Sequence, residues 1–400
     1  MSADEQPSTG KLQPGIAFAE GKRPAACFRL LLLDFADQIT PAQARDALAA
    51  VMEMLEGLGR GQVRELTDQP PAGAANSAQQ FRSLQTLLAY GRPAFSEQGP
   101  LPHVTRPHGL SSLSHPSPAF PALPWHASAT TNTGEAAIAL QLTADNAAAV
   151  NCAAIEVWKL IIDRALPLTV AGSFDGFGRP DGRGWLEFHD GVSNLEAGQR
   201  PAAIVAGPDP AWMDGGTYLA FLRIRIDLSR WSTMSRVEQK LTIGRDKLTG
   251  AGLTDVVTDQ SGQEQPRMGD PAPEPDSPRW RDPAQTLDPH LEVSHIHRAN
   301  QTRASGWAPG ALRIFRQGFD YLEHFTAEGP ELGLNFISFQ RDLGVLHDLL
   351  HLPGWLGDSN FGGTSDSDPT DRPLLTLAAG GLYAVPPTER PFPTAGLFRP

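Results

Sequence analysis

The sequence predicts an α+β fold made of two similar halves, each an antiparallel sheet with helices on one face. The chain has 400 residues, enough for two domains, and its hydrophobic content of 40% can supply a sizeable core. Segments typical of strands and helices follow one another as strand, helix, strand, strand, helix, and the second half repeats this logic. Two such halves fit this order better than a doubly wound parallel fold does.

The first half opens with "ACFRLLLLDF", whose continuous apolar run predicts a strand buried on both faces. A helix is expected next, because Thr40 is a good N-cap, Pro41 suits the first helical position and glycines follow at the far end. "LQTLLAYG" and "EAAIALQLTADN" predict two more strands, and an Ala-rich helix follows over about residues 147–164. Residues 99–133, rich in Pro, Ser and His, are expected to form a long surface loop.

The second half opens with "GTYLAFLRIRIDL", in which alternation predicts a strong strand. Ser235 followed by Glu238 predicts a helix that begins with a capping box. Residues 258–290, with many prolines and acids, are expected to form a second long loop. "LGLNFISFQRDLGVLHDLL" predicts a strand running into a helix, and "GGLYAVPP" predicts a closing strand.

These elements suggest three segments along the chain. We expect a disordered lead over residues 1–14, an N-terminal domain over residues 15–200 and a C-terminal domain over residues 201–400.

Composition excludes several classes of protein. The net charge of -12 argues against a nucleic acid or an acidic membrane as partner. The two cysteines, Cys27 and Cys152, lie in apolar sequence, so neither a disulfide framework nor a cysteine-ligated metal is expected. The first residues lack the features of a signal peptide, and the apolar runs are too short to cross a bilayer. We therefore expect a soluble, cytoplasmic protein.

The stretch "VSHIHRANQTR" contains two histidines one residue apart. His295 follows a short β-branched run that is typical of the end of a strand. Strand alternation would place His295 and His297 on the same face.

Two Asp-Gly pairs lie in "GFGRPDGRGWLEFHDGVSNL". We interpret Asp181 as a turn residue, because Asp-Gly is a favoured turn dipeptide and glycines flank it. Asp190 differs, because it follows Phe188 and His189 and precedes an apolar residue. A carboxylate at the edge of an apolar segment is either paired or reactive.

Two arginines three positions apart, Arg313 and Arg316, lie in "LRIFRQGF". In a strand they would point to opposite faces, so one can point inward. Local sequence alone favours two solvated arginines. Together with a histidine at a strand end and a carboxylate in a Gly-flanked loop, an inward arginine can serve a haem. One side of such a site ligates iron and the other handles peroxide.

At this point the sequence resembles a known family along nearly all of its length. The segments that carry the resemblance are "LQTLLAYGRPAF", "EAAIALQLTADN", "LEFHDGVSNL", "WMDGGTYLAFLRIRIDLSRW", "EQKLTIGRDKLTGAGL", "SHIHRANQTR" and "RIFRQGF" with "GLNFISFQRDL". In this order they are similar to motifs of the dye-decolorising peroxidases. These are haem peroxidases with two ferredoxin-like domains in a dimeric α+β barrel arrangement.

The resemblance implies a role for three residues. His295 takes the place of the ligand to haem iron, Asp190 that of the distal acid-base residue, and Arg316 that of the distal arginine. Arg313 is the nearby alternative to Arg316. Arg316 is followed by Gln317 and Gly318, and a glycine there would let the backbone approach the cofactor closely.

The resemblance also implies contacts to heme b from Phe188, Arg298 and Arg303. The chain departs from the family pattern at several places, among them His297, which stands where an arginine or lysine is usual. Glu187 stands where the family has a glycine, and "QT" replaces a Pro-Arg pair after Asn300, which leaves open whether Arg298 or Arg303 contacts a haem propionate.

A member of this family would use hydrogen peroxide to oxidise bulky aromatic substrates such as dyes and phenolics by one-electron steps, and could form a homo-oligomer. Asp342 is a candidate hydrogen-bond acceptor for the second ring nitrogen of the haem ligand, or an ordinary acid at a helix start. Trp280 or Trp307 could relay electrons.

Three alternatives remain open. The protein could handle haem or iron with incidental peroxidase activity, or it could be a ferredoxin-like binding module without haem. A metalloenzyme using His103, His108 and His115 is a third idea, although these spacings resemble no usual set of metal ligands.

Overall fold

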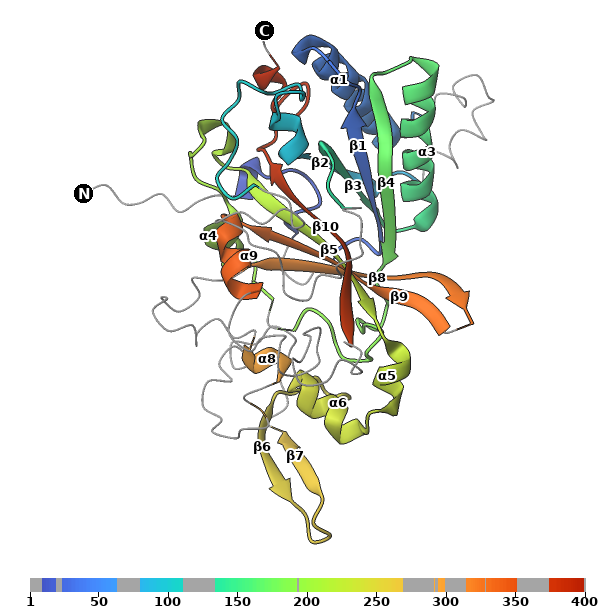
Figure 1. Ribbon diagram of the computed structural model, residues 1–400, viewed down its shortest axis with the longest axis vertical. Helices are drawn as coiled ribbons and strands as arrows, with labels where there is room; N and C mark the ends of the chain where they lie inside the picture. Colours follow the sequence, from blue (N-terminus) through green and yellow to red (C-terminus); the bar gives the residue numbers. More distant parts are fainter. Residues whose placement is uncertain are drawn as a thin grey trace, which may run out of the picture.

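Eight antiparallel strands form one closed barrel in the described part of the chain (Figure 1). The computed structural model describes residues 9–18, 24–62, 80–110, 134–192, 194–268, 291, 294–298, 314–327, 329–350 and 374–398. The barrel strands are β1 (Cys27–Phe35), β2 (Gln85–Gly91), β3 (Ile138–Ala144), β4 (Leu168–Phe177), β5 (Thr217–Ile226), β8 (Phe315–Thr326), β9 (Gly329–Gln340) and β10 (Leu375–Val385).

The barrel consists of two four-stranded sheets with the same topology. The first has the order β4-β1-β3-β2 and the second β10-β5-β9-β8, so in each sheet the first and third strands in sequence lie at the centre. This is the ferredoxin-like arrangement, and the prediction of two such α+β halves is confirmed. The sheets join where β2 pairs with β10 and where β4 meets β8, the latter through the pair Phe177 and Asp320. The domain boundary near residue 200 stays a prediction.

Helices α1 (Pro41–Gly59) and α3 (Ala147–Asp163) cover the outer face of the first sheet (Figure 1). The predicted start of α1 is confirmed, because the Thr40 side chain accepts a hydrogen bond from the Gln43 backbone and Pro41 opens the helix. Strand β1 is buried on both faces, as expected. Leu31 and Leu33 belong to the core under the helices, whereas Leu30 and Leu32 belong to the core inside the barrel.

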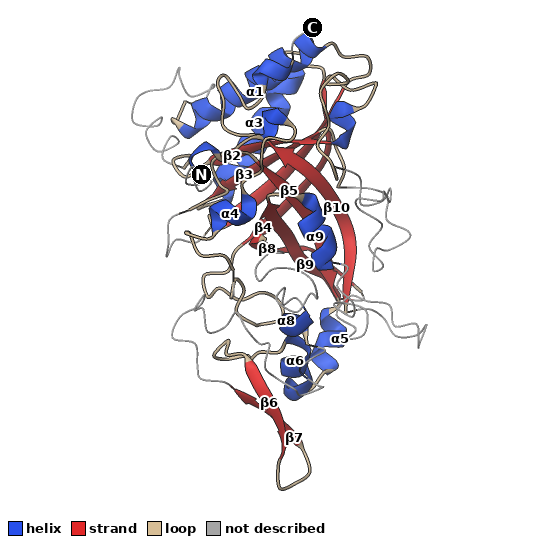
Figure 2. Ribbon diagram, turned by 90° about the vertical axis from the view of Figure 1, so that its left-hand side faces the viewer, coloured by secondary structure: helices blue, strands red, loops and turns tan. Residues whose placement is uncertain are grey.

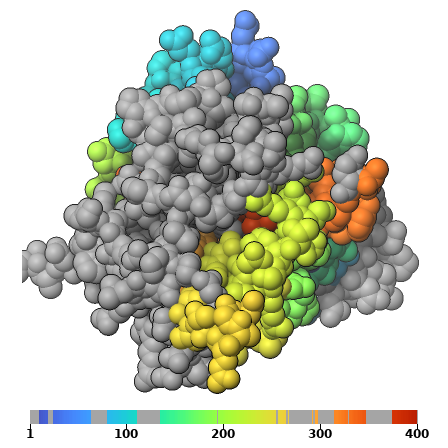
Figure 3. Space-filling view, turned by 60° about the horizontal axis from the view of Figure 1, so that its bottom comes forward, coloured from blue at the N-terminus to red at the C-terminus, as the bar shows by residue number. Residues whose placement is uncertain are grey.

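The second half carries a long insertion between β5 and β8. It contains α5 (Leu228–Thr233), α6 (Arg236–Ile243), the hairpin of β6 (Leu253–Thr258) and β7 (Glu264–Met268), and α8 (His295–Arg298). These elements gather at one end of the barrel, opposite α1 and α3 (Figure 2), and the hairpin projects from that end (Figure 3). The predicted capping box at Ser235 is confirmed.

The remaining helices are short. They are α4 (Arg200–Ile204), α9 (Leu343–Leu350) and the 3-10 helices Thr9–Lys11, Arg92–Phe95, Ala211–Met213 and Ala395–Leu397. None of the helices in the described ranges combines the length and apolar character that a membrane span needs.

Two sequence-based expectations are wrong in part. The loop predicted over residues 258–290 contains strand β7, which pairs with β6; residues 269–290 lie outside the described part of the chain. Residues 9–14, predicted as part of a disordered lead, pack against the barrel. The Gln13 amide donates hydrogen bonds to the carbonyl oxygens of Leu88 (2.8 Å) and Pro386 (2.9 Å), so it ties both sheets together.

Candidate functional site

Residues 178–190 form a loop closed like a hairpin, which we call the Asp190 hairpin. The Asp190 N–H donates to the carbonyl oxygen of Gly182 (2.9 Å), and the N–H of Gly184 donates to that of Phe188 (3.2 Å). Asp181 lies in the turn at the start of the hairpin, where its carboxylate accepts from the Arg183 N–H (3.1 Å). The interpretation of Asp181 as a turn residue is therefore confirmed.

The Asp190 hairpin is anchored to the loop that follows α6. The Arg183 guanidinium donates to the carbonyl oxygens of Lys247 (2.6 Å) and Leu248 (2.9 Å). From the opposite direction, Lys247 Nζ lies 2.6 Å from the Glu187 carboxylate. The two segments thus hold each other in place by reciprocal charged contacts.

Glu187 adopts a left-handed backbone conformation with φ of 66°, which normally favours glycine. This explains why the related family has glycine at this position. The hydrogen bond from Lys247, together with its charge, lowers the pKa of the Glu187 carboxyl, so the side chain is held as an ion pair. Phe188 is buried against Trp231, with ring centroids 6.2 Å apart. Phe188 therefore anchors the hairpin, and its contact with a haem stays a prediction.

The carboxylate of Asp190 lies directly on strand β8. Its Oδ2 atom is 2.5 Å from the position that a Cβ atom on Gly318 would occupy. Arg316 is two residues earlier on the same strand and therefore shares this face. The alternate residues Phe315 and Phe319 belong to the core inside the barrel. The structure thus brings Asp190 and Arg316 to one surface of β8, and their roles stay predictions. Arg313 lies outside the described residues.

Arg316 is fixed at its backbone by Asn194. The Asn194 side chain accepts from the Arg316 N–H (3.1 Å) and donates to its carbonyl oxygen (2.8 Å). The guanidinium donates to the carbonyl oxygen of Val192 (3.3 Å). Two residues that follow Asp190 in the chain, Val192 and Asn194, are therefore hydrogen-bonded to Arg316 on β8.

His295 begins the four-residue helix α8, so the prediction that it ends a strand is wrong. Helix α8 packs against the end of α6, where Gly244 has a left-handed φ of 86°. A Cβ atom on Gly244 would lie 2.5 Å from Ser294 Oγ and 2.7 Å from Ile296 Cγ1. Because this segment is helical, the strand alternation assumed for His295 and His297 does not apply.

The electrostatics of the site favour a neutral imidazole. Burial, followed by the charges of Arg316 and Arg245, lowers the pKa of His295 to about 3. The lone pair of the ring is then available to a metal at neutral pH. Because the charge of Arg316 acts on this imidazole, His295 lies within electrostatic reach of the strand face that carries Arg316.

Sequence reasoning missed Arg245, which is 5% exposed. Burial, and then the charge of Arg316, lowers its pKa to about 10. Its guanidinium donates to the carbonyl oxygen of Gly250 (3.1 Å). The signal available in the sequence was an arginine between glycines in "TIGRDKLTGAG".

Asp320 was also missed. It is 5% exposed and lies on β8, on the face shared by Arg316 and Gly318. Burial, and then the charge of Asp190, raises the pKa of its carboxyl to about 7. Two carboxyls therefore occupy neighbouring positions on one strand face.

These groups suit an anionic cofactor that contains a metal. A neutral imidazole offers a metal ligand, and two buried or half-buried arginines offer positive charge to carboxylates of such a cofactor. Of the other predicted contacts, Arg298 ends helix α8, whereas Arg303 lies outside the described residues.

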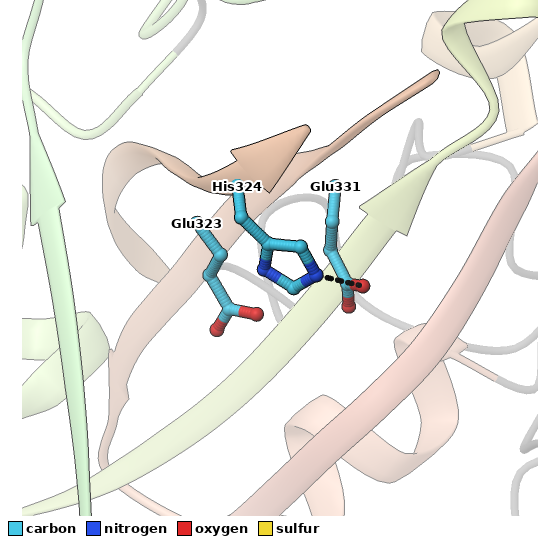
Figure 4. A group of neighbouring side chains, drawn as sticks. All are labelled: Glu323, His324 and Glu331. Carbon is cyan, nitrogen blue, oxygen red and sulfur yellow. Dashed lines mark ion pairs between the residues drawn. The ribbon is translucent and has the colours of Figure 1, made fainter. Parts of the chain in front are cut away.

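A second group of possible metal ligands lies at the far end of β8 and β9 (Figure 4). Glu323 forms an ion pair with the buried Arg223, and His324 Nε2 is 3.8 Å from the Glu331 carboxylate. Ion pairing within the protein accounts for this group.

Of the other candidates for metal or ligand binding, some have ordinary structural roles and some lie outside the described residues. Asp342 accepts from the Gly344 N–H (2.6 Å) at the start of α9, which is the helix-start role rather than that of a partner to the iron ligand. His103 and His108 are exposed in a loop. His115, Trp280 and Trp307 lie outside the described residues.

The chain is similar to known proteins over most of its length. Residues 181–390 match the family model described as "Dyp-type peroxidase, C-terminal". A dye-decolorizing peroxidase of Thermobifida fusca is 28% identical over 366 residues, which covers 86% of this chain and 75% of that protein. A deferrochelatase of Escherichia coli (strain K12) is 29% identical over 179 residues, but the match covers 44% of this chain and 35% of that protein.

Solved structures share the fold. Ferric DtpA from Streptomyces lividans superposes with a TM-score of 0.69 at 22% identity, covering 98% of this chain and 97% of that one. A DyP-type peroxidase from Cellulomonas bogoriensis gives a TM-score of 0.68 at 20% identity, covering 98% and 100%. A variant of DypB from Rhodococcus jostii in complex with heme gives 0.59 at 19% identity, covering 94% and 96%.

Proposed function

Because this chain belongs to the Dyp-type peroxidase family, we propose that His295 holds its haem iron and that Asp190 and Arg316 act on hydrogen peroxide. The chain is a haem peroxidase, an oxidoreductase that takes peroxide as its oxidant. The reductants that we propose are bulky aromatic molecules such as dyes and phenolics, oxidised one electron at a time.

One observation supports this assignment above the others. Asp190 lies on Gly318, two residues from Arg316, and the charge of Arg316 in turn acts on His295. Two of these residues share one surface of β8 and the third lies within electrostatic reach of Arg316, which supports a common site. Ordinary structural roles for Asp190 as a turn residue, Arg316 as a solvated arginine and His295 as a core histidine would not require this proximity.

The pocket suits heme b, which supplies the redox centre when bound. His295 would donate a nitrogen lone pair to the iron, because its low pKa keeps the ring neutral at all physiological pH values. Arg245 and Arg316 would offset the negative charge of the haem propionates, and Arg298 or Arg303 could add to this.

Asp190 and Arg316 would move the proton and stabilise charge. The Asp190 carboxylate would take a proton from one peroxide oxygen and return it to the other, which leaves as water, while bound haem would supply the two electrons that cleavage of the O–O bond requires. A positioned base of this kind contributes about 10²–10⁴-fold to the rate. The Arg316 guanidinium stabilises negative charge on the leaving oxygen.

Absorption spectroscopy tests this function. Haem-loaded protein should show a Soret band that changes within one turnover after one equivalent of peroxide, and should return to its starting spectrum when a reducing dye is added. A Soret band that does not respond to peroxide would instead favour haem binding without peroxidase activity. Homo-oligomerisation and a cytoplasmic location are proposals that this experiment does not address.

A further inference from the structure

Asp320 and Asp190 reach the same face of β8 from different parts of the chain. Asp320 belongs to the strand itself, two residues after Gly318, and side chains at that spacing point to the same side. Asp190 comes from the Asp190 hairpin and rests its carboxylate on Gly318. The two carboxyls are therefore neighbours on one strand surface.

The surroundings of the two carboxyls are unequal. Asp320 is 5% exposed, whereas Asp190 is exposed and accepts a hydrogen bond at Oδ1 from the Gly191 N–H (2.7 Å). Desolvation penalises the charged form of the buried Asp320 carboxyl. Two neighbouring carboxyls do not both ionise readily, and the buried member is the one that keeps a proton.

Asp320 also lies where the Asp190 hairpin meets the barrel. It forms the strand pair with Phe177 that joins β4 to β8. Its Oδ1 atom is 3.6 Å from the Cβ position of Gly184, and the backbone N–H of Trp185 donates to its carboxyl. The Trp185 indole donates to the carbonyl oxygen of Tyr321 (3.0 Å). A charge on Asp320 would therefore act on the segment that holds Asp190.

The other charged groups around Asp320 do not remove the effect of Asp190. Arg179 favours the ionised form of Asp320, but its guanidinium is bound to Asp181 at 2.6 Å. The negative charge of Asp181 also opposes ionisation of Asp320, but its effect is weaker than that of Asp190. With burial and the charge of Asp190, the outcome is a pKa of about 7 for the Asp320 carboxyl.

We infer that Asp320 is a positioning residue of the peroxide site, whose protonated carboxyl keeps a second negative charge away from the Asp190 carboxylate on Gly318. When Asp320 loses this proton, two negative charges face each other on β8. Their repulsion lifts the Asp190 hairpin and its carboxylate away from Gly318. This inference deepens the proposed function, and its second test below depends on that function.

The first test measures the unfolding of the full-length chain against pH, for wild type and Asp320→Asn. The asparagine keeps the oxygen that accepts from Trp185 but cannot ionise. Because the pKa of Asp320 is raised on folding, its contribution to stability is present below about pH 4 and is lost as pH rises toward 7. Relative to the variant, the wild-type unfolding equilibrium constant should rise by up to about tenfold per pH unit across that window. Parallel curves for the two proteins would overturn the inference.

A second variant covers the case in which Asp320→Asn does not fold. Asp190→Asn removes the neighbouring charge, so Asp320 should ionise more readily. Stability should then stop falling at a lower pH in Asp190→Asn than in wild type. An unchanged pH dependence in this variant would also contradict the pairing.

The second test measures the pH profile of the reaction with peroxide by stopped flow. The wild-type rate should fall above pH 7, by about tenfold at pH 8, since a tenth of the sites then keep the proton. Asp320→Asn should retain its rate over this range, and the control Asp181→Asn should follow wild type. The same alkaline loss in wild type and Asp320→Asn would overturn the inference. A wild-type protein that binds haem but does not react with peroxide would refute the proposed function instead, and the unfolding test would still decide the pairing.

Discussion

The carboxylate of Asp190 occupies the space that a side chain at Gly318 would need, with Oδ2 2.5 Å from the missing Cβ position. The position of the Asp190 carboxylate therefore requires a residue without a side chain at position 318. In the family pattern this glycine follows the arginine by two residues, and the contact gives that spacing a physical reason.

Gly318→Ala should displace Asp190 while leaving the haem in place. Because a real Cβ contact essentially never falls below about 3.0 Å, the Asp190 carboxylate must move by a few tenths of an ångström or more. We expect a loss of about tenfold or more in the stopped-flow rate with peroxide, with haem content unchanged. Gly198→Ala, at a glycine with open space around it, is the matched control. Equal rates for wild type and Gly318→Ala would show that Asp190 does not need this position.

Asp190→Asn keeps the shape of the side chain but cannot accept the peroxide proton. We expect normal haem content and a loss of about 10²–10⁴-fold in the rate of the first reaction with peroxide. Asp181→Asn should react at nearly the wild-type rate, because Asp181 is exposed and serves the turn. A peroxide defect confined to the Asp181 variant would mean that the wrong Asp-Gly pair was assigned.

Arg316→Leu should bind haem and lose most of its rate with peroxide. Its backbone contacts with Asn194 are kept in the variant, so the strand and the segment after Asp190 stay in place. The variant removes the guanidinium charge from the site, together with the hydrogen bond from the guanidinium to the Val192 carbonyl oxygen. Arg313→Leu is the comparison, and it should cost stability or nothing. A fast Arg316→Leu enzyme beside a slow Arg313→Leu enzyme would reverse the assignment of the two arginines.

Most of the barrel was predictable from local sequence, whereas the site was predictable only in part. Strand β1 and helix α1 follow from an apolar run and from caps, which are local signals. Strand β4 has no comparable run, because many of its residues are exposed, and it was not predicted individually. Strand β7 contains a proline, and its residues were predicted to be part of a loop.

The site residues that were missed depend on contacts between distant segments. The environment of Asp320 is created by a hairpin more than 100 residues earlier in the chain. Arg245 is buried by tertiary packing that its polar neighbours in sequence do not suggest. His295 was identified through the family resemblance, but its secondary structure was wrong, because packing on Gly244 and not β-branching decides the conformation of that segment.

Gly244→Ala should therefore impair haem retention. The added Cβ would collide with Ser294 and Ile296 and so displace the helix that carries His295. Gly262→Ala is a matched control, because Gly262 has a similar left-handed φ of 81° but open space around it. Both variants carry backbone strain, and only Gly244→Ala should lower the haem-to-protein absorbance ratio. Equal ratios in the two variants would mean that the packing of α8 on α6 does not position the ligand.

The measurement that tests the central claim most directly is the Soret absorbance of purified His295→Ala, compared with wild type and His297→Ala after equal exposure to haem. If His295 is the iron ligand, wild type and His297→Ala should keep the Soret band and His295→Ala should lose most of it. The His295 variant should remain folded by circular dichroism, because a neutral ring is being removed from a four-residue helix. A full Soret band in His295→Ala together with its loss in His297→Ala would contradict the account.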